Sequence, residues 1–217
     1  MEWNKQNLIL NCYTKKSFMK SQELFKEFTD LLELRVASER KEKFLTLLSD
    51  YETTLKSAPA SMFLDNNYCY EGGLLQFAIN TYNFGLGLCK LYKSTDIALD
   101  FNLEEFTVAA LFNSIGLCGV DEDSFFVEET SDWHRKNLNR GYKFNDAAKF
   151  LVASDKSLYL LQKYVTLSYN EYVAIKIQAG LYDDSASKYL QIPETKKVTL
   201  GSIIMASTDA ARQMVSS

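Results

Sequence analysis

Apolar residues recur every three to four positions along most of the chain, which is the spacing that places them on one face of an α-helix. Two such segments precede Pro59, and the residue before a proline is disfavoured in helical conformation. We therefore predict a pair of helices within residues 1–56, of which residues 1–16 show no regular pattern. The apolar positions of the pair are Leu24, Phe25, Phe28, Leu31 and Leu32, then Phe44, Leu45, Leu48, Tyr51 and Leu55.

Residues 57–217 are predicted to form the main domain, on whose core the N-terminal pair packs, and their pattern indicates five more helices. The approximate ranges are 72–92, 103–117, 154–165, 168–180 and 200–214. Ser168 and Glu171 have the spacing of a capping box, and Gly180 is a typical helix stop. Residues 119–148 are the longest irregular stretch and leave room for short strands. The fold class that follows is all-α.

Composition excludes several classes of protein. The chain has 217 residues, 47% hydrophobic and 24% charged, which is typical of a soluble globular protein. A net charge of -4 argues against a nucleic-acid partner held by phosphate neutralisation. No apolar run suits a membrane span or a signal segment, so we expect a cytoplasmic protein without membrane contact. The cysteines have no zinc-ligand spacing; they are Cys12, Cys69, Cys89 and Cys118.

The functional interpretation starts from the segment 109–116, which reads Ala-Ala-Leu-Phe-Asn-Ser-Ile-Gly. It resembles the central helix of the HD-domain phosphohydrolases, in which an adjacent His and Asp follow an apolar run and both bind metal. The corresponding residues here are Phe112 and Asn113. Imidazole and carboxylate are good donors to a divalent ion, whereas a phenyl ring donates nothing and an amide offers only a neutral oxygen. The resemblance therefore implies a retained fold with lost ligands.

Four further motifs agree in order and spacing with a bacterial and bacteriophage branch of that family. Together with the central segment they span roughly residues 57–212, and the resemblance implies an HD-like helical domain. The motifs are Ala58-Pro59-Ala60-Ser61 with Tyr70-Glu71-Gly72-Gly73-Leu74-Leu75, then Asp155-Lys156-Ser157, Ala174-Ile175-Lys176-Ile177-Gln178-Ala179-Gly180-Leu181-Tyr182-Asp183, and Ser207-Thr208-Asp209-Ala210-Ala211.

Every departure from the family pattern falls on a position that the resemblance makes part of the metal site. The former metal-site positions are Phe77, Phe112, Asn113, Ala153, Gln178 and Asp209. Only Asp209 keeps a carboxylate, and we expect it to be a hydrogen-bond partner within its helix. Phe77 and Phe112 are expected to fill the space of the lost ligands. We therefore predict no metal, no cofactor and no catalytic residues.

A second set of residues lies, by resemblance, near the mouth of the former site: Lys156, Lys176, Tyr182 and Asp183. A lysine can hold a phosphate as a point charge, and Tyr182 could stack on a base. The simpler expectation is that both lysines are solvated. We expect the same of the charged run Glu39–Lys43, and we expect His134 to be a surface loop residue.

Three function hypotheses follow. The first is a catalytically inactive HD-domain-like protein, phage-encoded by resemblance, that binds a protein partner or a nucleotide. Within it we favour protein contact through the segment from Asp121 to Tyr142, because aromatic residues and arginine are enriched at interface hot spots. The second is a divergent metal-dependent nucleotide phosphohydrolase. The third is a structural component of a virion or another assembly. The sequence leaves open the partner, the oligomeric state and the choice between host cytoplasm and virion.

Overall fold

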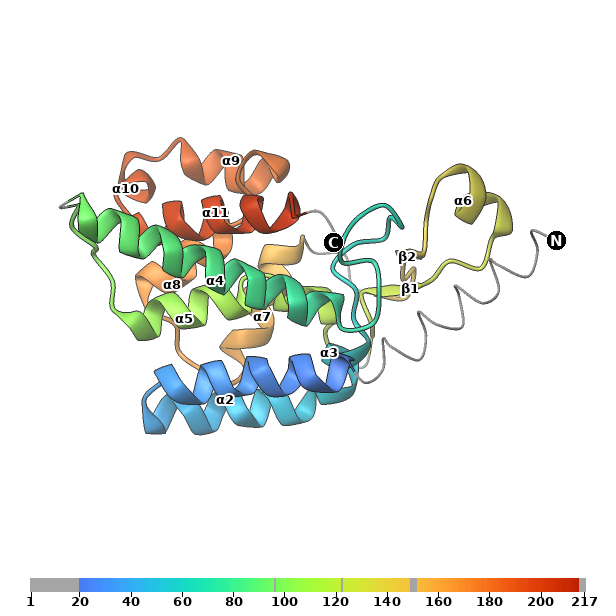
Figure 1. Ribbon diagram of the computed structural model, residues 1–217, viewed down its shortest axis with the longest axis horizontal. Helices are drawn as coiled ribbons and strands as arrows, with labels where there is room; N and C mark the ends of the chain where they lie inside the picture. The colour runs from blue at the N-terminus through green and yellow to red at the C-terminus, as the bar shows by residue number, and fades with distance from the viewer. Residues whose placement is uncertain (1–19, 96, 122, 149–151, 215–217) are drawn as a thin grey trace.

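A computed structural model describes residues 20–95, 97–121, 123–148 and 152–214. Within these ranges the protein is all-α apart from one two-stranded sheet, as predicted. Figure 1 shows a helical body with a smaller projection on one side, which carries the sheet and a short helix. The expectations for residues 1–16 and Cys12 lie outside the described residues. None of the described helices is both long and apolar enough to cross a bilayer.

The predicted N-terminal helices are present and lie side by side along one edge of the body (Figure 1). Residues 20–35 are helical, and α2 (Ser38–Asp50) and α3 (Glu52–Ser57) follow, with an interruption at Tyr51. The helices bury Phe28 and Phe44 in the same hydrophobic cluster that continues through the rest of the body. Residues on both sides of the predicted boundary between 56 and 57 therefore contribute to one hydrophobic cluster.

The five predicted helices of the main domain are also present. They are α4 (Gly73–Ser94), α5 (Leu103–Phe112), α7 (Ala153–Gln162), α8 (Tyr169–Ile177) and α11 (Thr199–Arg212). Helix α11 packs against α4 and α8, α5 packs against the same two helices, and α7 packs against α8. A Cβ atom at Gly85 of α4 would lie 2.6 Å from the Phe106 ring of α5, so the glycine allows this close approach.

The helix ends agree with the sequence-based predictions where a capping motif marks them. Both partners of the capping box at Ser168 and Glu171 are in place, and Asn102 with Glu105 forms a second one at the start of α5. Two C-terminal boundaries differ from the predictions. Helix α5 ends at Phe112, where the short 3-10 helix η1 (Ile115–Cys118) takes over. Helix α8 ends before Gly180, which has a φ of 55° and begins η2 (Gly180–Tyr182).

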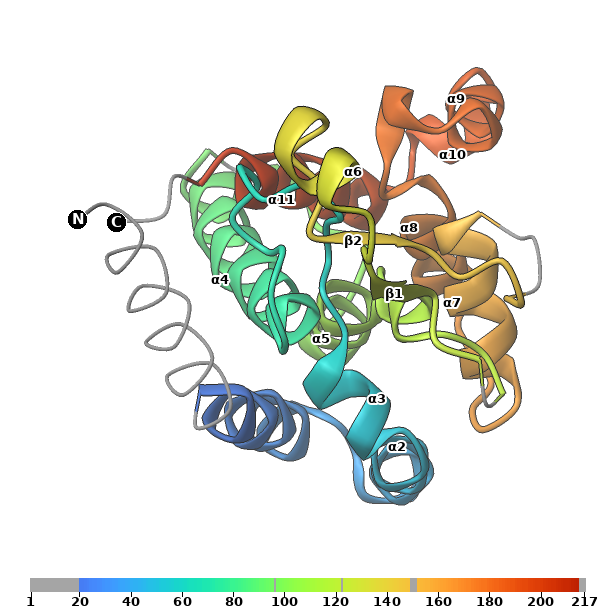
Figure 2. The ribbon, with the colours of Figure 1, turned by 90° about the vertical axis from the view of Figure 1, so that its right-hand side faces the viewer.

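Three short helices were not predicted, because each is too short to show a helical period. They are α6 (Asp132–Asn137), α9 (Asp184–Leu190) and α10 (Pro193–Lys196). The strands that the irregular stretch left room for are β1 (Phe126–Glu128) and β2 (Tyr142–Phe144), which pair antiparallel. Figure 2, viewed from the side of the projection, shows α6, β1 and β2 in front of the helical body.

Arg40 corrects the expectation that the charged run of α2 is entirely solvated. Its Nη1 lies 2.7 Å from Oε1 of Glu104, and its Nη2 lies 2.8 Å from Oε2 of Glu171, which is fully buried. Burial acts to lower the pKa of the guanidinium, but the hydrogen bonds and charges of the two glutamates outweigh it and raise the pKa. This cation therefore ties α2 to α5 and α8.

Candidate functional site

The six positions that the resemblance assigns to a former metal site do not form one group. Phe112 has no exposed surface, and its ring centroid lies 5.3 Å from that of Phe28 and 4.8 Å from that of Phe44, so it faces the N-terminal helices. Phe77 belongs to a second, smaller cluster with Tyr68 and Ala211. Both phenylalanines are buried, as predicted. They lie in separate clusters of the core and do not share one space.

Asn113, the residue after α5, has no free polar atom to offer a ligand. It is buried, and its Nδ2 donates to the carbonyl oxygen of Ala110 at 2.7 Å. Its Oδ1 accepts from the Ser114 hydroxyl at 2.5 Å. A buried amide that is satisfied by its own turn costs the fold little, so this side chain completes the end of the helix.

Arg212, which sequence reasoning missed, lies beside three of these six positions, Phe77, Gln178 and Asp209. Its guanidinium carbon lies 6.0 Å from the Phe77 ring centroid and 5.3 Å from that of Tyr182, and its Nη2 donates to Oε1 of Gln178 at 3.4 Å. Burial lowers the pKa of the guanidinium, and the nearby charge of Asp209 opposes that shift. The sequence feature that could have revealed Arg212 is its position three residues after Asp209, which puts both side chains on one side of α11.

A divalent metal does not fit this arrangement. The Phe77 ring and the methyl group of Ala153 donate nothing, and a guanidinium already stands beside the one remaining carboxylate, that of Asp209. That carboxylate also accepts from Nε2 of Gln213 at 3.1 Å, as expected of a partner within its own helix. Among the described residues, no three His, Cys, Asp or Glu side chains are grouped so as to hold a metal ion.

The two lysines expected to be solvated are buried, which corrects that prediction. Lys156 is 1% exposed, and its Nζ lies 4.5 Å from the centre of the Phe125 ring. Burial lowers the pKa of its ammonium, and the charge of Asp123 partly opposes this. Lys176 is 5% exposed; its Nζ pairs with the Asp155 carboxylate and donates to the Ser185 hydroxyl. Neither lysine is therefore an exposed cation at the surface.

Tyr182 and Asp183 also serve the fold locally. Tyr182 is 77% exposed and lies over the Arg212 guanidinium, while Asp183 caps α9 by accepting from the Ser185 backbone N–H at 2.8 Å. The hydroxyl of Ser154 lies 3.5 Å from the other Asp183 oxygen. Lys176 and Asp183 therefore share Ser185 as a partner, whereas Lys156 and Tyr182 have other partners, and none of the four residues lines the cavity described next.

A cavity of about 150 Å³ lies elsewhere, between α3, the start of α4, η1 and the sheet. Glu71 and Glu128 are exposed residues of its lining, and Phe126 adds an apolar surface. Burial, together with the charges of these two carboxylates, raises the pKa of the lining Tyr142 to about 12. The lining comes from five separate stretches of sequence, so no local motif could reveal it. The full lining is Thr54, Ser57, Ala58, Pro59, Glu71, Leu117, Cys118, Ser124, Phe125, Phe126, Val127, Glu128 and Tyr142.

The projection (residues 124–145) extends from this cavity and is held by an internal carboxylate. Glu129 is 2% exposed; its Oε1 accepts from the Ser131 backbone N–H at 2.9 Å and its Oε2 lies 3.0 Å from Nδ1 of His134. His134 therefore lies in α6 with a carboxylate partner, rather than in a surface loop. The hydrogen bond from the Glu129 N–H to the Gly141 carbonyl oxygen, at 3.0 Å, closes the base of the loop.

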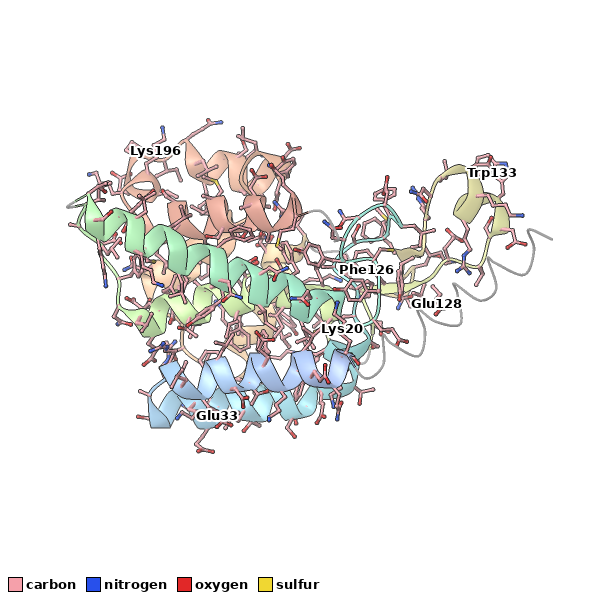
Figure 3. The ribbon with its side chains drawn as sticks, viewed as in Figure 1. Lys20, Glu33, Phe126, Glu128, Trp133 and Lys196 are labelled. Atoms are coloured by element: carbon pink, nitrogen blue, oxygen red, sulfur yellow. The ribbon has the colours of Figure 1, made fainter. Side chains whose placement is uncertain are left out.

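Aromatic side chains pack together at the base of the projection and are exposed at its far end. The rings of Phe125, Phe126 and Phe144 form a triangle with centroid separations of 4.7, 5.4 and 5.5 Å. At the far end, Trp133 is 61% exposed (Figure 3). Other large apolar side chains exposed on the projection and on the loop paired with it are Phe63, Leu64, Leu138 and Phe144.

Comparisons with known proteins assign no family. No protein-family model matches the chain, and neither a search of curated proteins nor one of solved structures found a match. The functional conclusions therefore rest on the residues and their geometry.

Proposed function

We propose that this chain is a catalytically inactive HD-domain-like protein that acts by binding a protein partner through the projection. The HD-like relationship rests on the sequence motifs described above. The absence of catalysis rests on the side chains at the former metal-site positions, where phenyl rings, engaged amides and the Arg212 guanidinium replace metal ligands.

The observation that carries the binding proposal is an exposed tryptophan on a hydrogen-bonded support. Trp133 is 61% exposed, although tryptophan is usually well covered in soluble proteins. Tryptophan is among the residues most enriched at interface hot spots. Because Glu129 fixes the turn of the chain into α6, little ordering of this segment is needed on binding.

Nucleotide binding has less support than protein binding. Phosphate groups would need Lys156 or Lys176 at the surface. Lys156 is buried against Phe125, and Lys176 is paired with Asp155. To engage a new anion, the buried Lys176 ammonium would have to leave the Asp155 carboxylate and reach the surface. We therefore retain nucleotide only as an alternative ligand.

The proposal is tested by site-specific photocrosslinking in cells that express the protein. A photoreactive phenylalanine analogue replaces Trp133 in one variant and Leu91, which is 55% exposed on α4, in a control variant. We expect a defined protein adduct from position 133 and none from position 91. The captured protein is then purified for calorimetry, in which Trp133→Ala should weaken binding by more than about tenfold, as for a hot-spot residue.

Leu91→Ala is the matched control and should bind as the parent does. Two results would contradict the proposal: no adduct at position 133, or the same adducts from both positions.

A further inference from the structure

We infer that the partner of the projection is a second copy of this chain, so that the end of each projection lies on the cavity at the base of the other. This inference deepens the proposed function and rests on it.

The helix at the far end of the projection and the cavity at its base carry opposite charges. Helix α6 has Arg135 and Lys136 against the single acid Asp132. Arg140 and Lys143 lie nearer the base, where they pair with Phe63 and Val127. The base carries the carboxylates of Glu71 and Glu128 in the lining of the cavity. Opposite charges that meet across an interface favour association and set its register.

The apolar groups at the two ends are complementary in the same way. Trp133 offers an exposed aromatic anchor at the far end. Pro59, Phe126 and Val127 provide apolar lining for the cavity at the base. An anchor that enters a concave apolar surface with polar residues around it is the usual arrangement of an interface hot spot.

The positions of these groups suit a two-fold axis. In Figure 3, Phe126 lies near the body of the molecule, Glu128 lies partway along the projection and Trp133 lies at its far end. Two projections placed side by side in opposite directions bring each far end to the base of the other. A two-fold interface is self-complementary, so the Trp133 contact and the charge contact each form twice.

The first experiment measures the oligomeric state by sedimentation velocity across a dilution series of the full-length chain. We expect a reversible dimer for the parent and a monomer for Trp133→Ala. The single charge reversals Glu128→Lys and Lys136→Glu should each weaken self-association by more than about tenfold, because each homodimer then places like charges opposite one another.

The second experiment mixes the two charge-reversal variants in equal amounts. In the mixed dimer, the lysine introduced by Glu128→Lys meets the glutamate introduced by Lys136→Glu. At the other, symmetry-related contact, the native Lys136 of the first variant meets the native Glu128 of the second. We therefore expect two variants that are monomeric alone to dimerise when mixed. This result cannot arise from misfolding, because misfolded chains would not regain association on mixing.

Charge reversals at the opposite side of the body serve as matched controls. Glu33→Lys and Lys196→Glu change exposed residues that Figure 3 shows on the helical body, away from the projection, and both should dimerise like the parent. A parent that stays monomeric, a dimer that survives Trp133→Ala, or a mixture no more associated than its components would overturn the inference. A crosslinked adduct with a different protein would then still support the proposed function.

Discussion

The ring of Phe112 shows how one side chain changes what its helix can do. It packs between Phe28 and Phe44 and brings no polar atom into the core. A histidine at this position would place two ring nitrogens among apolar groups. Packing against the N-terminal helices therefore conflicts with metal binding at residue 112.

Replacing Phe112 tests this. We expect Phe112→Ala to lower the free energy of unfolding by ~3–5 kcal/mol, the usual cost of truncating a buried phenylalanine. Phe112→His should also destabilise, because its buried nitrogens lack partners. Chemical denaturation measures the free energy of unfolding of both variants. Phe84→Ala is the control and should have a smaller effect, because Phe84 is 38% exposed. If both Phe112 variants unfold like the parent, the ring is not packed between the N-terminal helices.

Lys156 and Arg212 show how packing against aromatic rings buries a cationic side chain. Both cations lie against aromatic rings, Phe125 in one case and Phe77 with Tyr182 in the other. Burial lowers the pKa of both groups. A cation over a ring face is attracted to it most strongly where water is excluded. Their role is thus in packing as much as in charge.

Among the elements, the projection depends on a single carboxylate for its internal order. The hydrogen bond from the Ser131 backbone N–H is the main cause that lowers the pKa of Glu129 below its ordinary value of 4.5, and His134 adds to it against the cost of burial. A carboxyl group whose pKa is lower in the folded state stabilises that state when ionised. This contribution is complete above about pH 4.5 and is lost as the pH falls through the lower folded value.

We therefore predict that the projection opens on acidification before the helical body does. Trp133 fluorescence reports on this locally in a Trp3→Phe background, since the chain has two tryptophans. Glu129→Gln should weaken the acid dependence, because the amide does not ionise but can still accept from Ser131. Identical acid transitions in the parent and in Glu129→Gln would show that another group controls the opening.

At the scale of the whole molecule, ion pairs connect helices that are distant in the sequence. Arg40 joins Glu104 and Glu171, and Lys176 joins Asp155, so cations of the chain itself connect the helices. A structural metal, by contrast, would contribute its binding free energy to folding and would be lost to a chelator.

We expect the purified protein to contain no stoichiometric transition metal and to keep its melting temperature when a chelator is added. Elemental analysis and a thermal melt measure the two quantities. About one metal per chain, removed by the chelator together with part of the stability, would contradict the assignment of the former metal-site positions to packing.

The sequence by itself determined the local features of this protein. The helical periods, the capping box at Ser168 and Glu171, and the break at Pro59 each depend on residues within one turn of one another, so their physical causes are visible in a short segment. The all-α class follows from them. The burial of Phe77 and Phe112 also followed, since an aromatic side chain on an apolar helix face is usually covered.

Only the tertiary structure decided what lies beside these segments. The pairing of Lys176 with Asp155, the place of Arg212 between Phe77 and Tyr182, and the cavity below the sheet join residues that are far apart in the chain. A side chain is charged, buried or available according to its neighbours in space, and helical periodicity does not specify which helices those neighbours come from.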